Sequence, residues 1–256
     1  MQPNDNHGLP TTAGAPLRAP DQFSLLHSMT SKNPIIAIDG PSGAGKSTLS
    51  KLLARELALV NIDTGAMYRC VALAAARRGI DPDDAEALEA LCRELHIGFT
   101  PTANGEKVLL NGKDVSSAIR SPENSLLTSR IAACKAVRSA MVRLQQELGR
   151  EGGVVLEGRD IGTVVFPNAD VKFFLSASAE ERGRRRYEEL RAHGAAVDLQ
   201  QTIAEVRARD AADSAREHAP LLQAPDAIVV DSSAKDIDTV LAEMLAVIRT
   251  RLKDSC

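Results

Sequence analysis

One segment sets the architecture of this chain: Ile38-Asp39-Gly40-Pro41-Ser42-Gly43-Ala44-Gly45-Lys46-Ser47-Thr48. It contains the pattern G-x-x-x-x-G-K-[ST], in which the backbone N–H groups of a glycine-rich loop surround phosphate oxygens. The apolar run Ile35–Asp39 precedes the loop and predicts a strand. Leucines at positions 49, 52, 53 and 57 follow it at helical spacing, and a helix N-terminus adds a positive dipole there. The segment therefore predicts a site for the phosphates of ATP or GTP.

The polar residues of this loop have predicted tasks. Lys46 would reach the β and γ phosphates, and the Ser47 hydroxyl would ligate Mg²⁺, the predicted cofactor. Packing gives no reason for lysine and serine at these positions, which disfavours a turn without a ligand. The residues expected to bind ATP here are Gly40, Pro41, Ser42, Gly43, Ala44, Gly45, Lys46, Ser47 and Thr48.

Outward from the loop, strand and helix patterns alternate. Besides 35–39, strands are expected at about 57–63, 154–156, 171–175 and 227–230. Helices are expected at about 65–78, 83–96, 136–150, 178–193, 199–213 and 236–252, with another starting at Ser121-Pro122. Continuous apolar runs suit strands buried on both faces of a parallel sheet. The predicted fold class is therefore α/β with a five-stranded parallel sheet.

The middle of the chain departs from this alternation. Short strands are expected at 97–102, 107–111 and 114–119, joined by turns at Asn104-Gly105 and Asn111-Gly112. We interpret these strands as an inserted antiparallel lobe. The domain prediction is a core of 33–96 and 133–256, with a helical lid at about 178–218, and an inserted lobe at 97–132.

The first 32 residues have no hydrophobic period, which predicts a disordered tail. This tail would be dispensable if Met29 were the natural start of the protein. The remaining composition is ordinary, with 44% hydrophobic and 25% charged residues. No apolar run approaches the ~20 residues of a membrane span, so no membrane partner is expected.

Charge and composition also bear on location and partners. The net charge of −3, the absence of tryptophan and the scarcity of tyrosine and phenylalanine disfavour nucleic acid as a partner. The four cysteines lack Cys-x-x-Cys spacing and the five histidines lack metal-ligand spacing. We therefore expect a cytoplasmic protein without a disulfide framework or zinc site.

Arginine is concentrated in the second half of the chain, at positions 182, 184, 185, 186, 207, 209 and 216. One interpretation is a solvated face with ion pairs to nearby glutamates, particularly for Arg184, which helical spacing directs away from Arg182 and Arg185. The other is a mobile lid whose guanidinium groups neutralise phosphates during transfer and exclude water.

The sequence lacks the constellations of other enzyme classes. No Ser-His-Asp, Cys-His or paired-carboxylate arrangement is visible, and none is needed if the acceptor is a phosphate that is already anionic near neutral pH. A guanine-nucleotide switch is disfavoured, because Asn111-Gly112-Lys113-Asp114 has the wrong order for its base-reading segment. Glu157 follows an apolar strand and is either an indirect partner of magnesium that acts through the groups bound to the ion, a helix cap or a paired buried acid. These features favour a kinase for a small acceptor.

Four segments together resemble the bacterial cytidylate kinases of the nucleoside-monophosphate kinase group, over about Ile35 to Lys253. They are the phosphate-binding segment above, Asp63-Thr64-Gly65-Ala66-Met67-Tyr68-Arg69, Gly158-Arg159-Asp160-Ile161-Gly162-Thr163-Val164-Val165-Phe166-Pro167 and Arg207-Ala208-Arg209-Asp210. The first is widespread, and the second and third are more specific. The resemblance implies a P-loop kinase core, an inserted monophosphate-binding lobe and phosphoryl transfer from ATP to CMP or dCMP.

The resemblance also implies roles for individual residues. The acceptor phosphate would be held by Thr64, Arg69, Arg159 and Arg216. Cytosine would be read by Ser129, Arg138 and Asp160, and the ribose hydroxyls by Arg209 and Asp213. The lid residues on ATP would be Arg182, Arg185 and Arg186, and the catalytic set Lys46, Arg159, Arg182 and Arg185.

Several alternatives stay open at this point. Tyr68 would pack under the base or belong to the core, and Ser129 and Arg138 could be ordinary exposed helix residues. Another small-acceptor kinase, for UMP or shikimate, is the runner-up, and a regulatory module that binds ATP without turnover is a hypothesis of another class. The expected partners are ATP and CMP or dCMP, and the expected state is a monomer.

Overall fold

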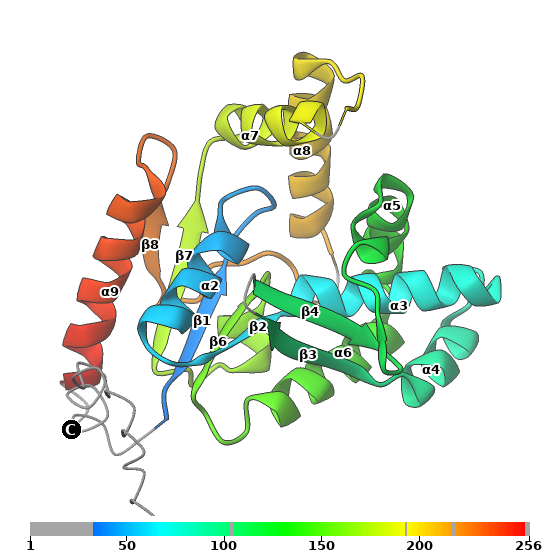
Figure 1. The fold of residues 1–256 in the computed structure, drawn as a ribbon, viewed down its shortest axis with the longest axis horizontal. Coiled ribbons are helices and arrows are strands. Elements are labelled where there is room, and N and C mark those ends of the chain that lie inside the picture. Colours follow the sequence, from blue (N-terminus) through cyan, green and yellow to red (C-terminus); the bar gives the residue numbers. More distant parts are fainter. Residues whose placement is uncertain (1–32, 103–104, 193, 217–218, 254–256) are drawn as a thin grey trace, which may run out of the picture.

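A computed structural model of the chain describes residues 33–102, 105–192, 194–216 and 219–253. The expected tail, Met29 and Asn104 lie outside the described residues. A parallel five-stranded sheet forms the centre (Figure 1), as the sequence predicts, with the strand order β2-β6-β1-β7-β8. Its strands are β1 (Ile35–Asp39), β2 (Val60–Asp63), β6 (Val154–Gly158), β7 (Val171–Ser176) and β8 (Ile228–Asp231).

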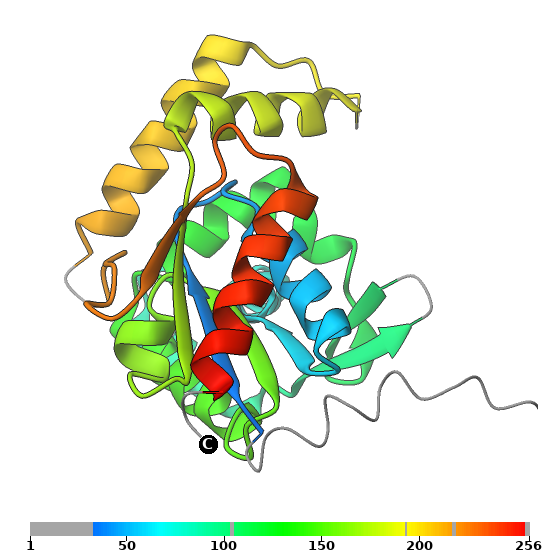
Figure 2. The same cartoon turned by 90° about the vertical axis from the view of Figure 1, so that its left-hand side faces the viewer.

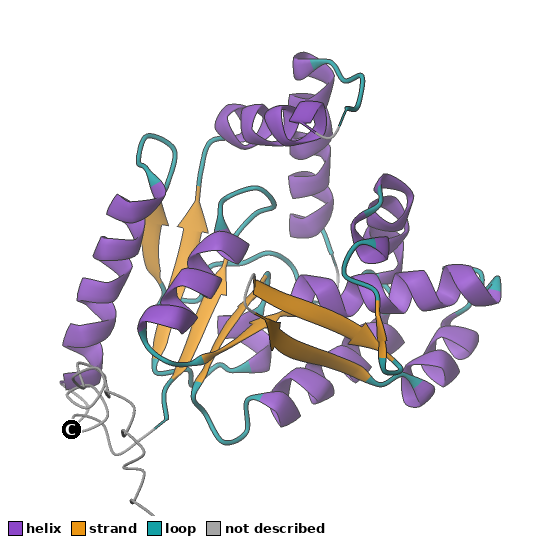
Figure 3. Ribbon diagram, in the orientation of Figure 1, coloured by secondary structure: helices purple, strands orange, loops and turns teal. Residues whose placement is uncertain are grey.

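The central strand β1 is followed directly by the phosphate-binding loop. β1 pairs with β6 on one side, where Asp39 lies beside Gly158, and with β7 on the other. Because the strands are parallel, their carboxyl ends meet at one edge of the sheet, where ligands bind in open α/β folds. The arrows of these strands point toward α7 and α8 in Figure 3.

Helices cover both faces of the sheet (Figure 2). α2 and α9 bury side chains such as Leu53 and Met244 against one face. The other face shares a core with α3, α4 and α6, to which Met67, Leu88 and Met141 contribute. The helix bounds are α2 (Lys46–Glu56), α3 (Thr64–Arg78), α4 (Ala85–Glu94), α5 (Pro122–Ile131), α6 (Lys135–Leu148), α7 (Ala179–Ala192), α8 (Leu199–Ser214) and α9 (Ile237–Lys253).

Local signals explain where several helices begin and end. The Asp63 carboxylate accepts a hydrogen bond from the Ala66 backbone N–H at 2.8 Å and caps α3, which ends at Gly79 with φ 63°. Ser121 caps α5 in the same way, and Pro122 occupies the first turn, as predicted. The strand expected at 57–63 is shorter, because α2 runs to Glu56 and Ala58 turns with φ 53°.

A second sheet of three antiparallel strands follows α4 and precedes α5 along the chain. It consists of β3 (Ile97–Thr102), β4 (Gly105–Leu110) and β5 (Lys113–Asp114). The strand predicted at 114–119 is wrong: β5 has only two residues, and the 3₁₀ helix η1 (Ala118–Arg120) follows. Val115 and Ile119 are both buried at a separation of four residues, which a helical turn satisfies as well as strand alternation does.

The helices α7 and α8 pack across one another at a steep angle at the carboxyl edge of the sheet (Figure 1). They pack closely at Gly183, where a Cβ atom would lie 2.4 Å from Cγ1 of Ile203. The predicted helices at 178–193 and 199–213 are thereby confirmed within the described residues. This pair places arginine side chains over the loop that follows β1.

Candidate active site

The phosphate-binding loop has the conformation that its glycines predict. Gly40, Gly43 and Gly45 have φ values of 147°, 79° and 97°. At Gly40 a Cβ atom would lie 2.0 Å from the carbonyl oxygen of Leu175, so another residue could not follow this path. The Lys46 ammonium curls back and donates to the carbonyl of Pro41 at 2.7 Å. The loop therefore closes around the N-terminus of α2.

Buried charged side chains of both signs lie beside Lys46. Burial, with Arg159 nearby, lowers the pKa of Lys46, while Glu157 and Asp39 favour its charged form. Burial also raises the pKa of Glu157, whose side chain bonds to Ser47. Among the described residues, none donates a hydrogen bond to the buried Oε1 of Glu157. A hydroxyl and a carboxylate with an unused oxygen are suitable donors for Mg²⁺, which binds oxygen ligands.

Arg182 supports the loop from α7. Its side chain is only 5% exposed and donates twice to the Asp210 carboxylate of α8, at 2.9 and 2.6 Å. The same guanidinium donates to the carbonyl of Ser42 at 3.1 Å and to that of Ala177 at 2.8 Å. Arg182 thus joins the helix pair to the phosphate-binding loop in this structure.

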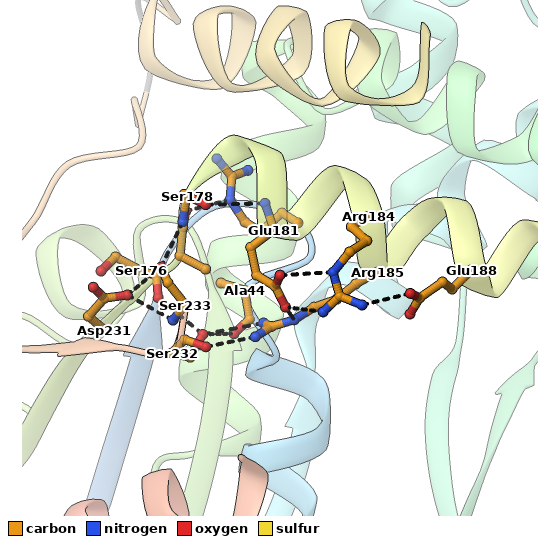
Figure 4. A network of polar contacts seen from close by, with 12 residues as sticks. Ala44, Ser176, Ser178, Glu181, Arg184, Arg185, Glu188, Asp231, Ser232 and Ser233 are labelled. Carbon is orange, nitrogen blue, oxygen red and sulfur yellow. Dashed lines mark hydrogen bonds and ion pairs between the residues drawn. The ribbon is translucent and has the colours of Figure 1, made fainter. Parts of the chain in front are cut away.

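The neighbouring arginines of α7 have different surroundings. Arg185 donates to the backbone carbonyl of Ser232 at 2.7 Å and to Glu181 at 2.9 Å (Figure 4). The buried Ser232 hydroxyl bonds in turn to the carbonyl of Ala44 at 3.0 Å. Arg186 is more exposed and pairs with Glu189 at 2.8 Å. Arg184 pairs with Glu181 and Glu188, as the solvated-face interpretation predicts.

A pocket of about 310 Å³ opens beside this network. Its walls come from the loop and α2, from α7, and from the segment between β8 and α9. The lining residues are Ala44, Gly45, Thr48, Leu49, Arg185, Ser232, Lys235, Ile237 and Val240. A largely apolar pocket that adjoins a phosphate-binding loop has the character of a site for a nucleotide base.

Several arginines gather near Asp213, at the C-terminal end of α8. We define the arginine cluster as Arg69, Arg159, Arg209 and Arg216. The carboxylate of Asp213 is 1% exposed and accepts hydrogen bonds from Arg159 at 2.8 Å and Arg216 at 2.5 Å. Burial opposes its charge, but these arginines outweigh burial and lower the pKa of Asp213. Burial and Arg159 lower the pKa of Arg209 to about 10. Among the described residues, none accepts a hydrogen bond from the buried Nε of Arg209.

A second buried group lies beside the arginine cluster. Arg138 of α6 pairs with Asp160, and both side chains are less than 8% exposed. The Arg138 guanidinium also lies 5.5 Å from the centre of the Tyr68 ring. Burial raises the pKa of Tyr68 to about 12, so the phenol stays neutral. Of the two interpretations of Arg138, the exposed helix residue is therefore wrong.

Within the described ranges, the remaining predicted acceptor residues, Thr64, Arg69 and Ser129, form no hydrogen bond to the other members of the arginine cluster or to the Arg138–Asp160 pair. The Thr64 hydroxyl donates to the carbonyl of Glu157 at 2.6 Å, which leaves its oxygen free to accept only. Arg69 follows on the same helix, and its carbonyl accepts from Asn124 of α5 at 3.1 Å. Ser129 is half-buried on α5, and no described contact links it to Arg138 or Asp160.

Three residues at this edge were not assigned a role from the sequence. Asp39, Asp210 and Ser232 each bond to a segment that is far away along the chain. A carboxylate at the carboxyl end of a buried parallel strand could have pointed to Asp39, since ligand sites lie there. Asp210 stands in one of the segments that carry the family resemblance, but no role was assigned to it, and nothing in the local sequence distinguishes Ser232 from other polar residues.

The described part of the chain contains no group of three or more His, Cys, Asp or Glu side chains that could hold a metal ion by themselves. Cys70, Cys92 and Cys134 are free thiols. None of its helices combines the length and the apolar character that a membrane crossing requires.

Known proteins resemble this chain over most of its length. Residues 36–250 match the family model for cytidylate kinase. A cytidylate kinase of Syntrophotalea carbinolica is 64% identical over 85% of this chain and 92% of its own, and one of Geobacter sulfurreducens is 59% identical over 85% and 93%. A solved shikimate kinase of Acinetobacter baumannii covers 88% of this chain with a TM-score of 0.44 and 14% identity. The chain thus belongs to the cytidylate kinase family, as its sequence predicted.

Proposed function

We propose that this chain carries out the reaction for which its family is named, the transfer of a phosphoryl group from ATP to CMP or dCMP. The observation that best supports this reaction is the arginine cluster beside the phosphate-binding loop. Arg159 lies close enough to Lys46 to lower its pKa, so two sites for phosphate adjoin one another. Four arginines around one carboxylate have excess positive charge, which the phosphates of two nucleotides would neutralise.

The donor side consists of the loop and the adjoining pocket. The nine loop residues from Gly40 to Thr48 would bind the phosphates of ATP, and the pocket beside Arg185 and Ser232 would take its base. Ser47, with Glu157 behind it, would hold Mg²⁺. When bound, this ion neutralises charge on the phosphates and helps to orient them.

The acceptor side consists of the arginine cluster and the buried group beside it. Asp160 and Arg138 would read cytosine, whose edge offers an amino donor and two acceptors, with Ser129 adding a hydroxyl and Tyr68 lying beneath the ring. Arg209 and Asp213 would contact the ribose. The acceptor phosphate would be bound by Arg69, Arg159 and Arg216, and by Thr64 once its hydroxyl turns away from the Glu157 carbonyl and donates to the phosphate.

Catalysis in this arrangement needs alignment and charge neutralisation and no general base. The acceptor phosphate oxygen is already anionic near neutral pH, since its second pKa is ~6. Lys46 and Arg159 would stabilise charge on the transferred group. Arg182, Arg185 and Arg186 would act from the α7–α8 pair as it closes over ATP and excludes water.

The test is ADP release from Mg-ATP with CMP, dCMP, UMP, AMP, shikimate or no acceptor. We expect CMP and dCMP to stimulate ADP release at least about a hundred-fold over no acceptor, because a site whose buried polar groups pair with cytosine leaves them unpaired with another base. Asp160→Ala removes one of these groups and should abolish the preference for CMP over UMP and AMP. Arg93→Gln, an exposed helix residue of α4, is the matched control and should behave as wild type.

The other outcomes separate the alternatives. Preferential stimulation by UMP or shikimate would contradict the acceptor assignment and identify the runner-up activity. ATP binding without release in any mixture would identify a regulatory module. The monomeric state and the cytoplasmic location stay predictions, which light scattering and cell fractionation would check.

A further inference from the structure

Asp39 ends the central strand and holds the turn that follows β6. Its side chain is buried, and its two oxygens accept hydrogen bonds from consecutive backbone N–H groups, Ile161 at 2.8 Å and Gly162 at 2.7 Å. We propose that Asp39 is a positioning residue for the acceptor, which fixes the turn at 159–160 so that both of its side chains face the substrate. The proposal rests on the proposed function and adds a residue to it.

This turn needs support from outside its own segment. The chain leaves β6 at Gly158 and enters the single π-helical turn η2 (Ile161–Val165), whose first N–H groups have no partner within the helix. Asp39 lies beside Gly158 across the β1–β6 pairing, at the level where these groups begin. One carboxylate therefore satisfies two donors and sets where the turn lies relative to the sheet.

The turn carries two side chains toward the acceptor site in different directions. Arg159 donates to Asp213 of α8 at 2.8 Å, and Asp160 pairs with Arg138 of α6. Because these residues are adjacent in the chain, any displacement of their backbone moves both of them together. A shift of about 1 Å at such residues is sufficient to cost up to about a hundred-fold in rate.

Asp39 also precedes the phosphate-binding loop, but its hydrogen bonds do not go there. The Lys46 ammonium bonds to the carbonyl of Pro41, whereas both carboxylate oxygens of Asp39 face η2. Asp39 also favours the charged form of Lys46, but its contribution is smaller than that of Glu157. Loss of the clamp should therefore change the acceptor parameters more than the ATP parameters. That difference distinguishes a positioning role from a general contribution to folding.

A matched control lies at the opposite end of the same strand. The Asp170 carboxylate accepts a hydrogen bond from the Ile35 backbone N–H at 2.8 Å. It is likewise an aspartate that holds the backbone near a strand end, but it lies away from the site. Asp170→Asn should thus report what the loss of a carboxylate–backbone bond does without displacing the turn.

A second variant disturbs the clamp without removing the carboxylate. A Cβ atom on Gly162 would lie 3.4 Å from Oδ2 of Asp39 and 3.1 Å from Cδ of Lys172. The approach to Lys172 is tighter than an ordinary van der Waals contact, so Gly162→Ala crowds the hydrogen-bonded turn from the side of Lys172. It keeps the test available if Asp39→Asn does not yield folded protein.

The experiment measures KM and kcat for CMP, UMP and ATP, with thermal unfolding, for wild type and the three variants. For Asp39→Asn and Gly162→Ala we expect KM for CMP to rise at least about ten-fold and the preference for CMP over UMP to fall by a similar factor, with KM for ATP within about two-fold. Asp170→Asn should keep all three substrate parameters.

Three results would overturn the proposal. They are an equal rise of KM for ATP and CMP, a loss of thermal stability with unchanged acceptor parameters, and the same acceptor defect in Asp170→Asn. The proposed function is judged separately on the wild type. If CMP does not stimulate ADP release there, both fail; if it does and the variants keep the CMP preference, only the role of Asp39 fails.

Discussion

Two side chains of the arginine cluster, Arg159 and Arg216, donate to the carboxylate of Asp213, while Arg209 lies near other arginines and its buried Nε has no acceptor among the described residues. The pKa of Arg209 is lowered to about 10 by burial and by Arg159, so its charge is unfavourable in the folded protein when no anion is bound. An anion that binds there should stabilise the fold by mass action.

We therefore expect sulfate or inorganic phosphate to raise the thermal unfolding temperature, by about 3 °C for each kcal/mol of binding free energy. Arg209→Gln should lose much of this rise and be no less stable than wild type without the anion, because a repelled cation is removed. Scanning calorimetry at several anion concentrations measures both effects. An equal rise in wild type and variant would contradict the prediction, and Arg93→Gln is the control for a general salt effect.

The ionisation of Asp39 should make stability depend on pH. Burial raises the pKa of Asp39 to about 6 from its ordinary value of 3.8, although the hydrogen bonds from Gly162 and Ile161 favour the charged form. The folded state thus binds the proton more tightly than the unfolded state does. The protonated carboxyl therefore makes its full contribution to the free energy of unfolding below about pH 4. This contribution, roughly 3 kcal/mol at most, is lost as the pH rises through about 6.

Wild type should accordingly lose stability relative to Asp39→Asn as the pH rises from about 4 through about 6, because the amide does not ionise. Urea denaturation at a series of pH values measures this difference. Two curves that stay parallel over this range would show that the carboxyl of Asp39 does not titrate there. The same series on Asp170→Asn provides the reference for an exposed carboxylate–backbone bond.

Among the elements, α7 and α8 are joined by the buried ion pair of Arg182 with Asp210 and by the exposed pair of Glu180 with Arg207. Asp210→Asn would leave the guanidinium of Arg182 buried without its carboxylate and should cost about 3 kcal/mol of stability. Because Arg182 also donates to the carbonyl of Ser42, we expect KM for ATP to rise more than KM for CMP. Glu188→Gln, which removes an exposed partner of Arg184 on α7, should cost no more than about 0.5 kcal/mol. Chemical denaturation and initial rates measure these effects, and equal costs for the two variants would contradict the prediction.

The elements themselves were largely predictable from the sequence. All five strands of the parallel sheet lie where the sequence predicts strands, and the phosphate-binding loop identifies the first of them. The edge strands β2 and β8 are only partly buried, so burial on both faces holds for the three inner strands. The exception, at 114–119, has its buried residues Val115 and Ile119 at a spacing that fits both a strand and a helical turn. Hydrophobic pattern alone cannot separate the two over so few residues.

The site was predictable where residue type and neighbouring motif coincide, as at Lys46, Arg159 and Asp160. It was not predictable where a side chain serves a segment that is distant along the chain. Asp39 bonds to Ile161, and Ser232 bonds to Ala44; both contacts exist only because parallel strands bring their carboxyl ends together. The family resemblance supplied roles for motif residues, but not for these supporting contacts.

For the molecule as a whole, the proposed donor and acceptor sites meet at the central strands. The loop after β1 lies between the acceptor residues after β6 and the pocket beside β8 and α9. A compound that joins adenosine and cytidine through a chain of phosphates should therefore occupy both sites at once.

We expect this compound to raise the unfolding temperature more than ATP and CMP added together at the same concentration, because its second half binds without a further loss of translational freedom. Asp160→Ala should reduce the advantage over ATP alone. Thermal unfolding with the joined and the separate ligands measures this. An effect no larger than that of ATP alone would contradict the adjoining of the two sites.

The order of strands in the sheet also has a consequence for how the protein is made. Ile35 in β1 pairs with Val154 in β6, and Ile36 pairs with Val171 in β7. At ordinary rates of translation, the ribosome needs on the order of ten seconds to pass from the first of these strands to the others. During that interval β1 is an apolar segment without neighbours, and the loop after it has no sheet to hold it. A nascent chain therefore forms its nucleotide site only after β7 has left the ribosome. Until then, β1 is a segment to which chaperones could bind.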